Sequence, residues 1–185
     1  MSEAVAPAAP GDVVAFWQAA GHDKWFTKDA AFDDAVRARF LTTYEAAAGG
    51  DLAHWEATAE GALALVIVLD QFPRNMFRGS ARIYAADPLA RAIADRALVR
   101  GFDRAVASEL RTFFYLPFMH SEALADHERC VALYRDLGDA DSLRWAEDHA
   151  DIIRRFGRFP HRNEVLGRAT TADEQAFLDA GGFAG

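Results

Sequence analysis

The sequence predicts an all-α fold, and three observations carry this prediction. Apolar residues repeat at helical spacing over several long stretches, and glycines and prolines stand at the ends of these stretches. No segment alternates apolar with polar residues between turn dipeptides, as a half-buried strand would. We therefore expect a single helical domain over residues 12–185, preceded by a flexible Ala/Pro-rich lead over residues 1–11.

Two helices in the first half of the chain are predicted from their end signals. One runs from Asp29 to the Gly49-Gly50 pair, with an apolar residue at every fourth position. Its predicted core residues are Phe32, Val36, Phe40 and Tyr44. The other has Asp87 as its predicted N-cap with Pro88 at the first helical position, and it ends at Arg100 because Gly101 follows.

A helix between these two is predicted to be buried. The stretch Ala62–Phe72 is apolar on all sides until Asp70, and we expect it to end where Pro73 prevents its continuation. Asp70 would then face the negative end of the helix dipole while losing hydration at the edge of the core. Such a carboxylate needs a cation, which Arg74, Arg78 or a more distant arginine would supply.

Three further helices are predicted in the second half. One starts at Ser121 and ends at Leu137, before Gly138, and the next covers about residues 142–156. A short last helix is indicated by Thr171 and Glu174, which have the spacing of a capping box. The side chains of the two longer helices predicted to face the core are Leu124, Val131, Tyr134, Trp145, His149, Ile152, Ile153 and Phe156.

The charge of the chain is unevenly distributed. Residues 154–168 hold five arginines, one histidine and one glutamate, a formal charge of +4 that leaves −12 for the rest of a chain whose total is −8. An acidic body repels a nucleic-acid backbone, so we expect no nucleic-acid partner. The local basicity suits a small anion, an acidic peptide or internal carboxylates instead.

The composition also indicates the cellular compartment of the protein. The longest apolar run has eight residues, from Ala62 to Leu69, whereas a membrane span needs roughly twenty. No signal peptide is recognisable, and the single cysteine, Cys130, fits a reducing environment. We expect a soluble cytoplasmic protein with no membrane partner.

Three polar segments are candidates for a site. DQFPRN (residues 70–75) and RFPHRN (residues 158–163) each place Arg-Asn shortly after a Phe-Pro pair, and these are named here the first and second breaks. A third segment, FFYLPFMHSE (residues 113–122), ends an apolar run with polar side chains. If the three converge, their arginines would suit a carboxylate or phosphate and their histidines and glutamate would titrate nearby. The predicted ligand-binding residues are Gln71, Arg74, Asn75, His120, Glu122, His149, Arg158, His161, Arg162 and Asn163.

The same residues have a structural interpretation. Asp70, Glu109 and Glu122 would pair with the arginines in a buried network that fixes how helices dock, and Asn75 and Asn163 would cap backbone groups. The sequence leaves both interpretations open.

Four segments resemble a known bacterial family. They are WFTKDAAFD (residues 25–33), LDQFPRNMFRG (residues 69–79), FFYLPFMHSE (residues 113–122) and RFGRFPHRNEVLGR (residues 155–168). Together they are similar to the hallmark segments of the family catalogued as domain of unknown function 924, over about residues 16–183. The resemblance implies stacked antiparallel helix pairs in a tetratricopeptide-repeat-like fold, and it implies no established activity. Asp173 departs mildly from the glutamate expected there.

Three classes of function remain. The chain could bind or transform a small anionic metabolite, offer a groove between helix pairs to an acidic peptide, or use its motifs only to secure the fold. Whether it is an enzyme, and its oligomeric state, stay open. No metal is expected, because His120 and Glu122 are two positions apart and no HExxH motif supports them. No nucleotide loop is present, so no cofactor is expected.

Overall fold

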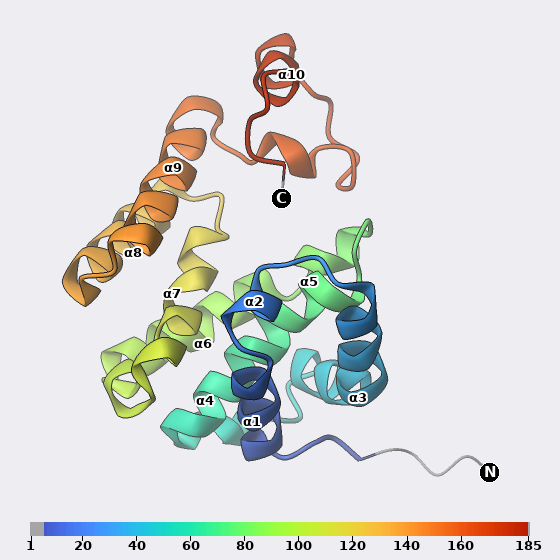
Figure 1. Ribbon diagram of the computed structural model, residues 1–185, viewed down its shortest axis with the longest axis vertical. Helices are drawn as coiled ribbons and strands as arrows, with labels where there is room; N and C mark the ends of the chain where they lie inside the picture. Colours follow the sequence, from blue (N-terminus) through green and yellow to red (C-terminus); the bar gives the residue numbers. More distant parts are fainter. Residues whose placement is uncertain (1–5, 185) are drawn as a thin grey trace. The chain divides into compact units, whose positions relative to one another are not determined.

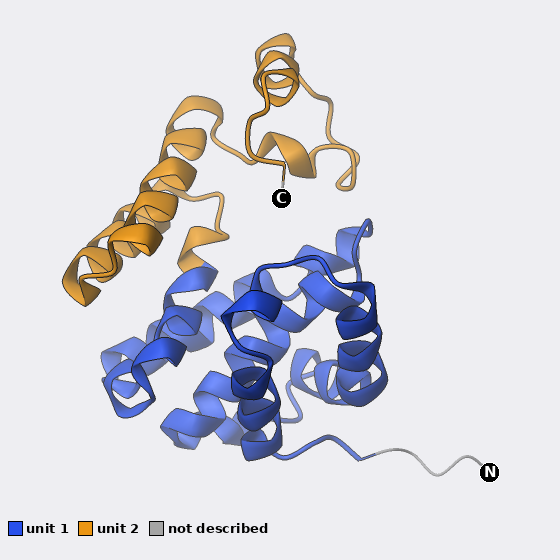
Figure 2. Cartoon of the chain, viewed as in Figure 1, with its two compact units in different colours: residues 1–117 blue, residues 118–185 orange. Residues whose placement is uncertain are grey.

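A computed structural model of the protein describes residues 6–184 of the 185-residue chain. The chain divides into two compact units, residues 1–117 (unit 1) and residues 118–185 (unit 2), and each is described here by itself (Figure 2). Helices build both units, and no strand occurs among residues 6–184, which confirms the all-α fold. Compact units of this kind can belong to one folding domain, so the single domain over residues 12–185 stays a prediction.

The expected flexible lead lies partly outside the described residues, since these begin at residue 6. Within the described part, the first helix begins at Pro10, so residues 10 and 11 are helical. Proline suits this position, because the first turn of a helix does not use its amide protons. Just before it, the Ala8 amide donates to the Thr43 hydroxyl at 2.9 Å.

Unit 1 is a cluster of helices around the buried chain segment that precedes the first break (Figure 1). Its α-helices are α1 (Pro10–Ala20), α2 (His22–Trp25), α3 (Ala30–Ala48), α4 (Ala59–Val66), α5 (Phe72–Met76), α6 (Asp87–Val99) and most of α7 (Thr112–Met119), which runs into unit 2. Short 3-10 turns lie at Ala53–Ala57, Ala81–Tyr84, Phe102–Ala105 and Ser108–Leu110.

The predicted end signals of α3 are confirmed, and α6 ends as predicted, with Arg100 as its C-cap and Gly101 next in the left-handed conformation at a φ of +70°, but the predicted N-cap of α6 is wrong. The Asp29 side chain caps α3 by accepting from the Phe32 amide at 3.0 Å. Asp87, in contrast, is the first residue of α6 and Ala86 holds the N-cap position. The reason is that both Asp87 carboxylate oxygens accept from the Arg74 guanidinium, each at 3.0 Å, so this side chain does not cap the helix.

The buried helix does not end before Pro73, contrary to the sequence prediction. After α4 the chain makes a π-helical turn at Ile67–Gln71 and continues directly into α5, with the Phe72 amide donating to the Ile67 carbonyl. The wider turn starts a new α-helical segment, and Pro73 lies in its first turn, where an amide proton is not required. Asp70 lies inside the π-turn and is completely buried.

Unit 2 contains a helix pair and a smaller C-terminal segment (Figure 1). Its helices are α8 (Leu124–Leu137), α9 (Ala140–Phe156) and α10 (Ala172–Asp179), with a 3-10 turn at Pro160–Arg162. The two long helices, α8 and α9, pack against each other as neighbours, and the two residues between them reverse the chain. Gly138 takes a φ of +78° at this reversal, a left-handed conformation that glycine adopts without a steric penalty.

Two details of unit 2 correct the sequence predictions. The helix α8 begins at Leu124 and not at Ser121, because the Ser121 hydroxyl accepts from the Ala123 amide at 3.1 Å and so stabilises a turn ahead of the helix. Two residues predicted to face the core are exposed instead, Leu124 at 38% and Trp145 at 56%. Of the other residues predicted to face the core, Phe156 is half-buried, and the rest are buried, namely Val131, Tyr134, His149, Ile152 and Ile153.

The predicted end of α9 at residue 156 and the predicted capping box of α10 are confirmed. Gly157 ends α9 in the left-handed conformation, with a φ of +68°. Thr171 accepts from the Glu174 amide at 3.2 Å, and the Thr171 amide donates to the Glu174 carboxylate at 2.8 Å, which completes the capping box. No helix in the described part of the chain has both the length and the apolar character that crossing a bilayer requires.

Candidate functional site

The ten predicted site residues fall in both units. Gln71, Arg74 and Asn75 belong to unit 1, and the other seven belong to unit 2. Each group is described within its own unit, and the convergence of the two breaks stays a prediction.

The first break is organised around the buried carboxylate of Asp70. The Gln71 side chain donates to it at 2.7 Å, and the nearest Arg74 nitrogen lies 3.4 Å away. Arg74 also donates to the backbone carbonyl of Asp70 and holds Asp87 through two parallel hydrogen bonds. Burial alone lowers the pKa of Arg74, but Asp70 and Asp87 outweigh it and raise that pKa. The expected pairing of Asp70 with an arginine is therefore present.

A second carboxylate fixes the other end of the first break. Asp33, in α3, accepts from the Asn75 side chain at 2.8 Å and from Arg78 at 2.6 and 3.0 Å. This joins α5 to α3. The polar side chains of the first break thus act on neighbouring helices of unit 1.

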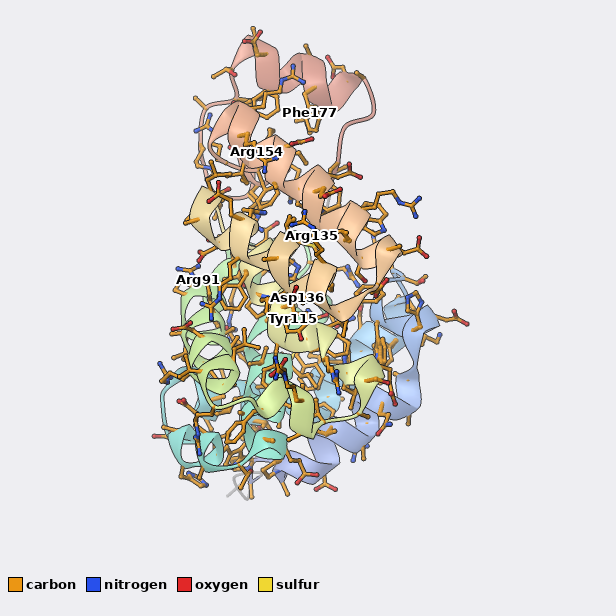
Figure 3. The ribbon with its side chains drawn as sticks, turned by 90° about the vertical axis from the view of Figure 1, so that its left-hand side faces the viewer. Arg91, Tyr115, Arg135, Asp136, Arg154 and Phe177 are labelled. Carbon is orange, nitrogen blue, oxygen red and sulfur yellow. The ribbon has the colours of Figure 1, made fainter. Side chains whose placement is uncertain are left out.

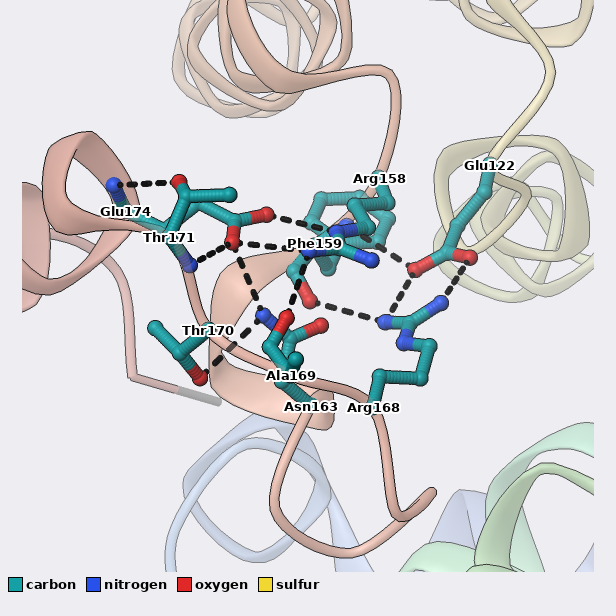
Figure 4. A network of polar contacts seen from close by, with 9 residues as sticks. All are labelled: Glu122, Arg158, Phe159, Asn163, Arg168, Ala169, Thr170, Thr171 and Glu174. Carbon is teal, nitrogen blue, oxygen red and sulfur yellow. Dashed lines mark hydrogen bonds and ion pairs between the residues drawn. The ribbon is translucent and has the colours of Figure 1, made fainter.

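In unit 2 the second break is organised around Glu174 (Figure 4). Arg158 donates to both of its carboxylate oxygens, at 2.6 and 2.8 Å, and Asn163 donates to one of them at 3.2 Å. The hydrogen bond from Arg158 is the largest cause that lowers the pKa of Glu174, to about 2. Glu174 therefore stays ionised while only 2% exposed, and it joins α10 to the second break.

Glu122 has a partner that the sequence prediction missed. Arg168 donates to its two carboxylate oxygens at 2.7 and 3.0 Å, and the Phe159 amide donates to it at 2.9 Å (Figure 4). Burial raises the pKa of Glu122, but Arg168 and the backbone amide outweigh burial and lower it. Glu122 is an ionised, paired carboxylate. The signal for Arg168 was its place at the end of the basic stretch.

Arg162 is buried and contacts both the backbone and an aromatic ring. Its guanidinium donates to the His120 carbonyl at 2.9 Å and stands 4.5 Å from the centroid of the Phe159 ring. Such stacking on an aromatic face is typical of arginine. His120 therefore contributes its backbone carbonyl to this contact.

Three histidines surround the Phe159 ring. The ring centroids of His127, His149 and His161 lie 5.8, 5.7 and 5.5 Å from that of Phe159. Burial lowers the pKa of His149 and of His161 to about 4 each, and it also lowers the pKa of His127. All three rings are neutral at pH 7. His127 was missed by the sequence prediction, although it shares a helical face with Val131.

Hydrogen bonds define the tautomers of two of these rings. The Trp145 carbonyl, 2.8 Å away, can only accept, so the neutral His149 ring carries its proton on Nδ1 and leaves Nε2 as a bare acceptor. For His127 the Ser121 carbonyl contacts Nε2 at 2.7 Å, so Nδ1 is the bare acceptor. That Nδ1 atom is buried with no hydrogen-bond partner in the described part of the chain.

Other reactive side chains are not arranged for chemistry. Cys130 is buried, and burial raises the pKa of its thiol to about 12, so it is uncharged at neutral pH. Among residues 6–184 no group of three histidine, cysteine or carboxylate side chains is arranged to hold a metal ion.

A concavity of about 430 Å³ lies on unit 2, along α9, α10 and the residues that follow α10. Figure 3 draws the side chains of this region, with Arg154 and Phe177 labelled. The concavity is lined by Trp145, Asp148, His149, Asp151, Ile152, Arg155, Phe156, Phe177, Gly181 and Phe183. Of the ten predicted site residues, His149 alone is in this lining.

The charged residues of the concavity differ from those of the network. Arg155 is exposed and lies over the rings of Phe156 and Phe177, 4.6 and 5.7 Å from their centroids. No described residue offers it a carboxylate, because the nearby Asp151 pairs with Arg154. Asp148 likewise has no ion-pair partner among residues 6–184. The concavity therefore presents one cation and one anion that the protein itself leaves available.

Comparisons with known proteins identify the family of this chain. A family model described as bacterial protein of unknown function (DUF924) matches residues 13–182, nearly the whole chain. The chain belongs to the DUF924 family. A solved structure, that of the protein of unknown function ATU0120 from Agrobacterium tumefaciens, is 52% identical to it with a TM-score of 0.90. The match covers 92% of this chain and 97% of that one. No curated protein matches the chain.

Membership in the DUF924 family confirms the resemblance drawn from the four sequence segments. It leaves the tetratricopeptide-like stacking as a prediction. The lining of the concavity was largely missed, because Trp145 was expected in the core and Arg155 was counted only as part of a basic stretch. A usable signal was the spacing of Asp148, Arg155 and Trp145, which puts a charged and an aromatic group on one side of α9.

Proposed function

We propose that this DUF924 protein binds a small organic anion, a carboxylate with an apolar or aromatic body, in the concavity of unit 2. The observation that carries the proposal is Arg155. Its guanidinium lines the concavity, stacks on Phe156 and Phe177, and has no carboxylate partner in the described chain. A guanidinium in this state can take a ligand carboxylate through two parallel hydrogen bonds, while the rings contact the apolar part of the ligand.

Three arginines in or near the two breaks support the fold interpretation rather than a ligand site. Arg74, Arg158 and Arg168 each hold a carboxylate of their own unit through two hydrogen bonds. An incoming anion would have to displace that carboxylate, and a partly buried carboxylate without a cation is strongly destabilising. The proposed anion site therefore lies on the exposed side of α9.

His149 contributes to recognition as a neutral group. Its ring is 6% exposed, lines the concavity and keeps Nε2 as an acceptor. A neutral ring does not repel the ammonium or hydroxyl groups of a ligand. It can accept one hydrogen bond from such a group.

A peptide is the second candidate ligand, and one observation favours it. Trp145 is 56% exposed at the rim, and exposed aromatic side chains are enriched where proteins bind one another. A peptide whose C-terminal carboxylate pairs with Arg155 would use the same concavity. This is the acidic-peptide alternative drawn from the sequence, placed at a different arginine.

The experiment is a binding screen with matched arginine variants. Aromatic and aliphatic carboxylates, their phosphate analogues and short acidic peptides are titrated by calorimetry, with Trp145 fluorescence as a second signal. We expect Arg155→Gln to weaken carboxylate binding by about tenfold or more, because it removes a charge-assisted contact. Arg144→Gln is the control, since Arg144 is exposed on the same helix, pairs with Asp141, and neither residue is in the lining.

Equal affinities of the two variants for every ligand that binds would contradict the proposal, as would a screen without any carboxylate ligand. Arg162→Ala is measured in parallel. Loss of binding in that variant, with Arg155→Gln unaffected, would favour the pocket predicted from the two breaks.

A further inference from the structure

The concavity contains an anionic group that the proposed anion site does not use. Asp148 is exposed and lines the same concavity as Arg155. It has no cation partner among residues 6–184, whereas its neighbour Glu147 lies 3.6 Å from Arg135 outside the lining. A carboxylate that the fold leaves available beside aromatic rings favours a cationic group of the ligand.

The positions of the two residues on α9 show on which side of the helix their side chains lie. Asp148 and Arg155 are seven residues apart on α9, which is nearly two helical turns and about 10 Å along the helix axis. Both side chains therefore lie on one side of the helix, at different heights. A ligand that contacts both must carry two opposite charges.

The lining residues next to Asp148 also suit a cation. His149 follows Asp148, and its Nε2 atom accepts hydrogen bonds because Nδ1 is used by the Trp145 carbonyl. The exposed Trp145 ring lies one turn before His149, and tryptophan is the aromatic side chain that attracts cations most strongly. The Asp148 end thus offers a carboxylate, a ring nitrogen acceptor and an aromatic face, and all three attract an ammonium group.

We infer that the ligand of this concavity is an amino carboxylate with an aromatic or apolar body. Its ammonium group binds at Asp148 and His149 Nε2, and its carboxylate binds at Arg155. This inference rests on the proposed anion site and adds the amine. Free amino acids and short peptides share this chemistry, and they differ in the distance between ammonium and carboxylate.

The test compares four compounds that differ by one group at a time. L-phenylalanine carries both charges, 3-phenylpropanoate lacks the amine, 2-phenylethylamine lacks the carboxylate, and the dipeptide phenylalanyl-phenylalanine separates the two charges further. We expect at least one of the two compounds with both charges to bind the full chain about tenfold more tightly than 3-phenylpropanoate at pH 7. A preference for the dipeptide would identify peptide termini as the source, and a preference for L-phenylalanine would identify a free amino acid.

Two substitutions that keep the size of the side chain test whether the ammonium group of the ligand binds at Asp148. Asp148→Asn is expected to abolish the advantage of the doubly charged compounds and to leave 3-phenylpropanoate binding as tight or slightly tighter. Glu147→Gln, which also removes one carboxylate charge from this part of α9, is expected to change neither. Circular dichroism confirms that both variants fold.

The outcomes separate the inference from the proposed function. If 3-phenylpropanoate binds through Arg155 as tightly as the amino compounds, the amine site is wrong and the anion site stands. If 2-phenylethylamine binds in an Asp148-dependent way and no carboxylate binds, the anion site is wrong and the amine contact stands. If none of the four compounds binds at millimolar concentration, both are overturned.

Discussion

The two breaks have nearly the same sequence and different backbones. In unit 1 a π-turn leads into the first break, the helix continues through Pro73, and the break is itself helical as α5. In unit 2 the helix α9 has already ended at Gly157, and Pro160 begins a short 3-10 turn. What precedes the break decides its backbone. A glycine with a positive φ ends a helix, whereas Gln71 allows it to go on.

The asparagines of the two breaks nevertheless make the same kind of contact. Each donates to a carboxylate, Asn75 to Asp33 at 2.8 Å and Asn163 to Glu174 at 3.2 Å. An arginine holds the same carboxylate through two hydrogen bonds, but its position differs: Arg78 lies after the first break, and Arg158 opens the second. The repeated arginines, Arg74 and Arg162, have different partners, so only the asparagine has the same role in both breaks.

The largest expected effect is at the carboxylate of the second break. Glu174 is 2% exposed and joins Arg158, Asn163 and Thr171, so Glu174→Gln removes the charge that all of these contacts share. We expect a loss of about 3 kcal/mol in the free energy of unfolding, because the Arg158 guanidinium is left without its partner. Urea denaturation measures this loss. The neighbouring change Asp173→Asn, at an exposed position, should cost less than about 0.5 kcal/mol.

A smaller loss of stability is expected from the protonation of His149 in mild acid. Burial holds the pKa of His149 at about 4 in the folded protein, below its value of about 6.5 when unfolded. The unfolded chain therefore binds the proton more readily. The stability contributed by the neutral ring is complete above pH 6.5 and falls as the pH drops from 6.5 towards 4. Linkage gives about 2 kcal/mol between pH 7 and pH 5 from this residue.

Urea denaturation from pH 8 to pH 4 measures this loss, and His149→Gln should flatten its slope. Glu174 contributes in a separate window, since its pKa of about 2 means that its stabilising charge is lost only as the pH falls below about 4.5. Hydrogen exchange shows which helix loses stability when His149 is protonated. Amides of α9 should lose protection between pH 7 and pH 5 before those of α4 do. Equal loss in both helices would contradict the assignment to His149.

The corresponding carboxylate of the first break should matter less. Asp33 pairs with Arg78, whose side chain is 37% exposed, whereas the side chain of Arg158 is 28% exposed. The side chain of Asp33 is 15% exposed and that of Glu174 is 3% exposed. We expect Asp33→Asn to cost about 1.5 kcal/mol in urea denaturation, which is half the loss at Glu174. The exposed change Asp34→Asn serves as the control. A cost equal to that of Glu174→Gln would show that exposure does not set the difference between the two breaks.

The comparison also shows which features could be predicted from the sequence. Caps are local, so the capping box of Thr171 with Glu174 was predicted correctly from its spacing, and the end of α9 at Phe156 was predicted from the short pattern there. Asp70 was predicted to need an arginine because a buried carboxylate must be paired, and Arg74 pairs with it. Features that depend on distant residues were not predictable in the same way. The carboxylate of Asp87 is used by Arg74 and therefore does not cap α6.

Much of the candidate site lay beyond sequence reasoning for the same reason. The concavity forms where α9, α10 and the residues after α10 meet, and no pattern within one helix shows which side chains another helix leaves exposed. Trp145 has the spacing of a core residue and is exposed because nothing in unit 2 covers that part of α9. The π-turn was equally hidden, since residues 67–71 have the composition of an ordinary buried helix.

The smallest expected effect separates the network from the concavity. Arg155 and Arg158 are three residues apart, but Arg158 holds Glu174 and Arg155 only stacks on aromatic rings. Arg155→Gln should therefore change the free energy of unfolding by less than about 0.5 kcal/mol, whereas Arg158→Gln should cause a clearly larger loss, because it leaves the Glu174 carboxylate without its cation. Parallel urea denaturation of the two variants measures the difference. A large loss for Arg155→Gln would mean that its guanidinium holds unit 2 together, and it would no longer be the group left available for a ligand.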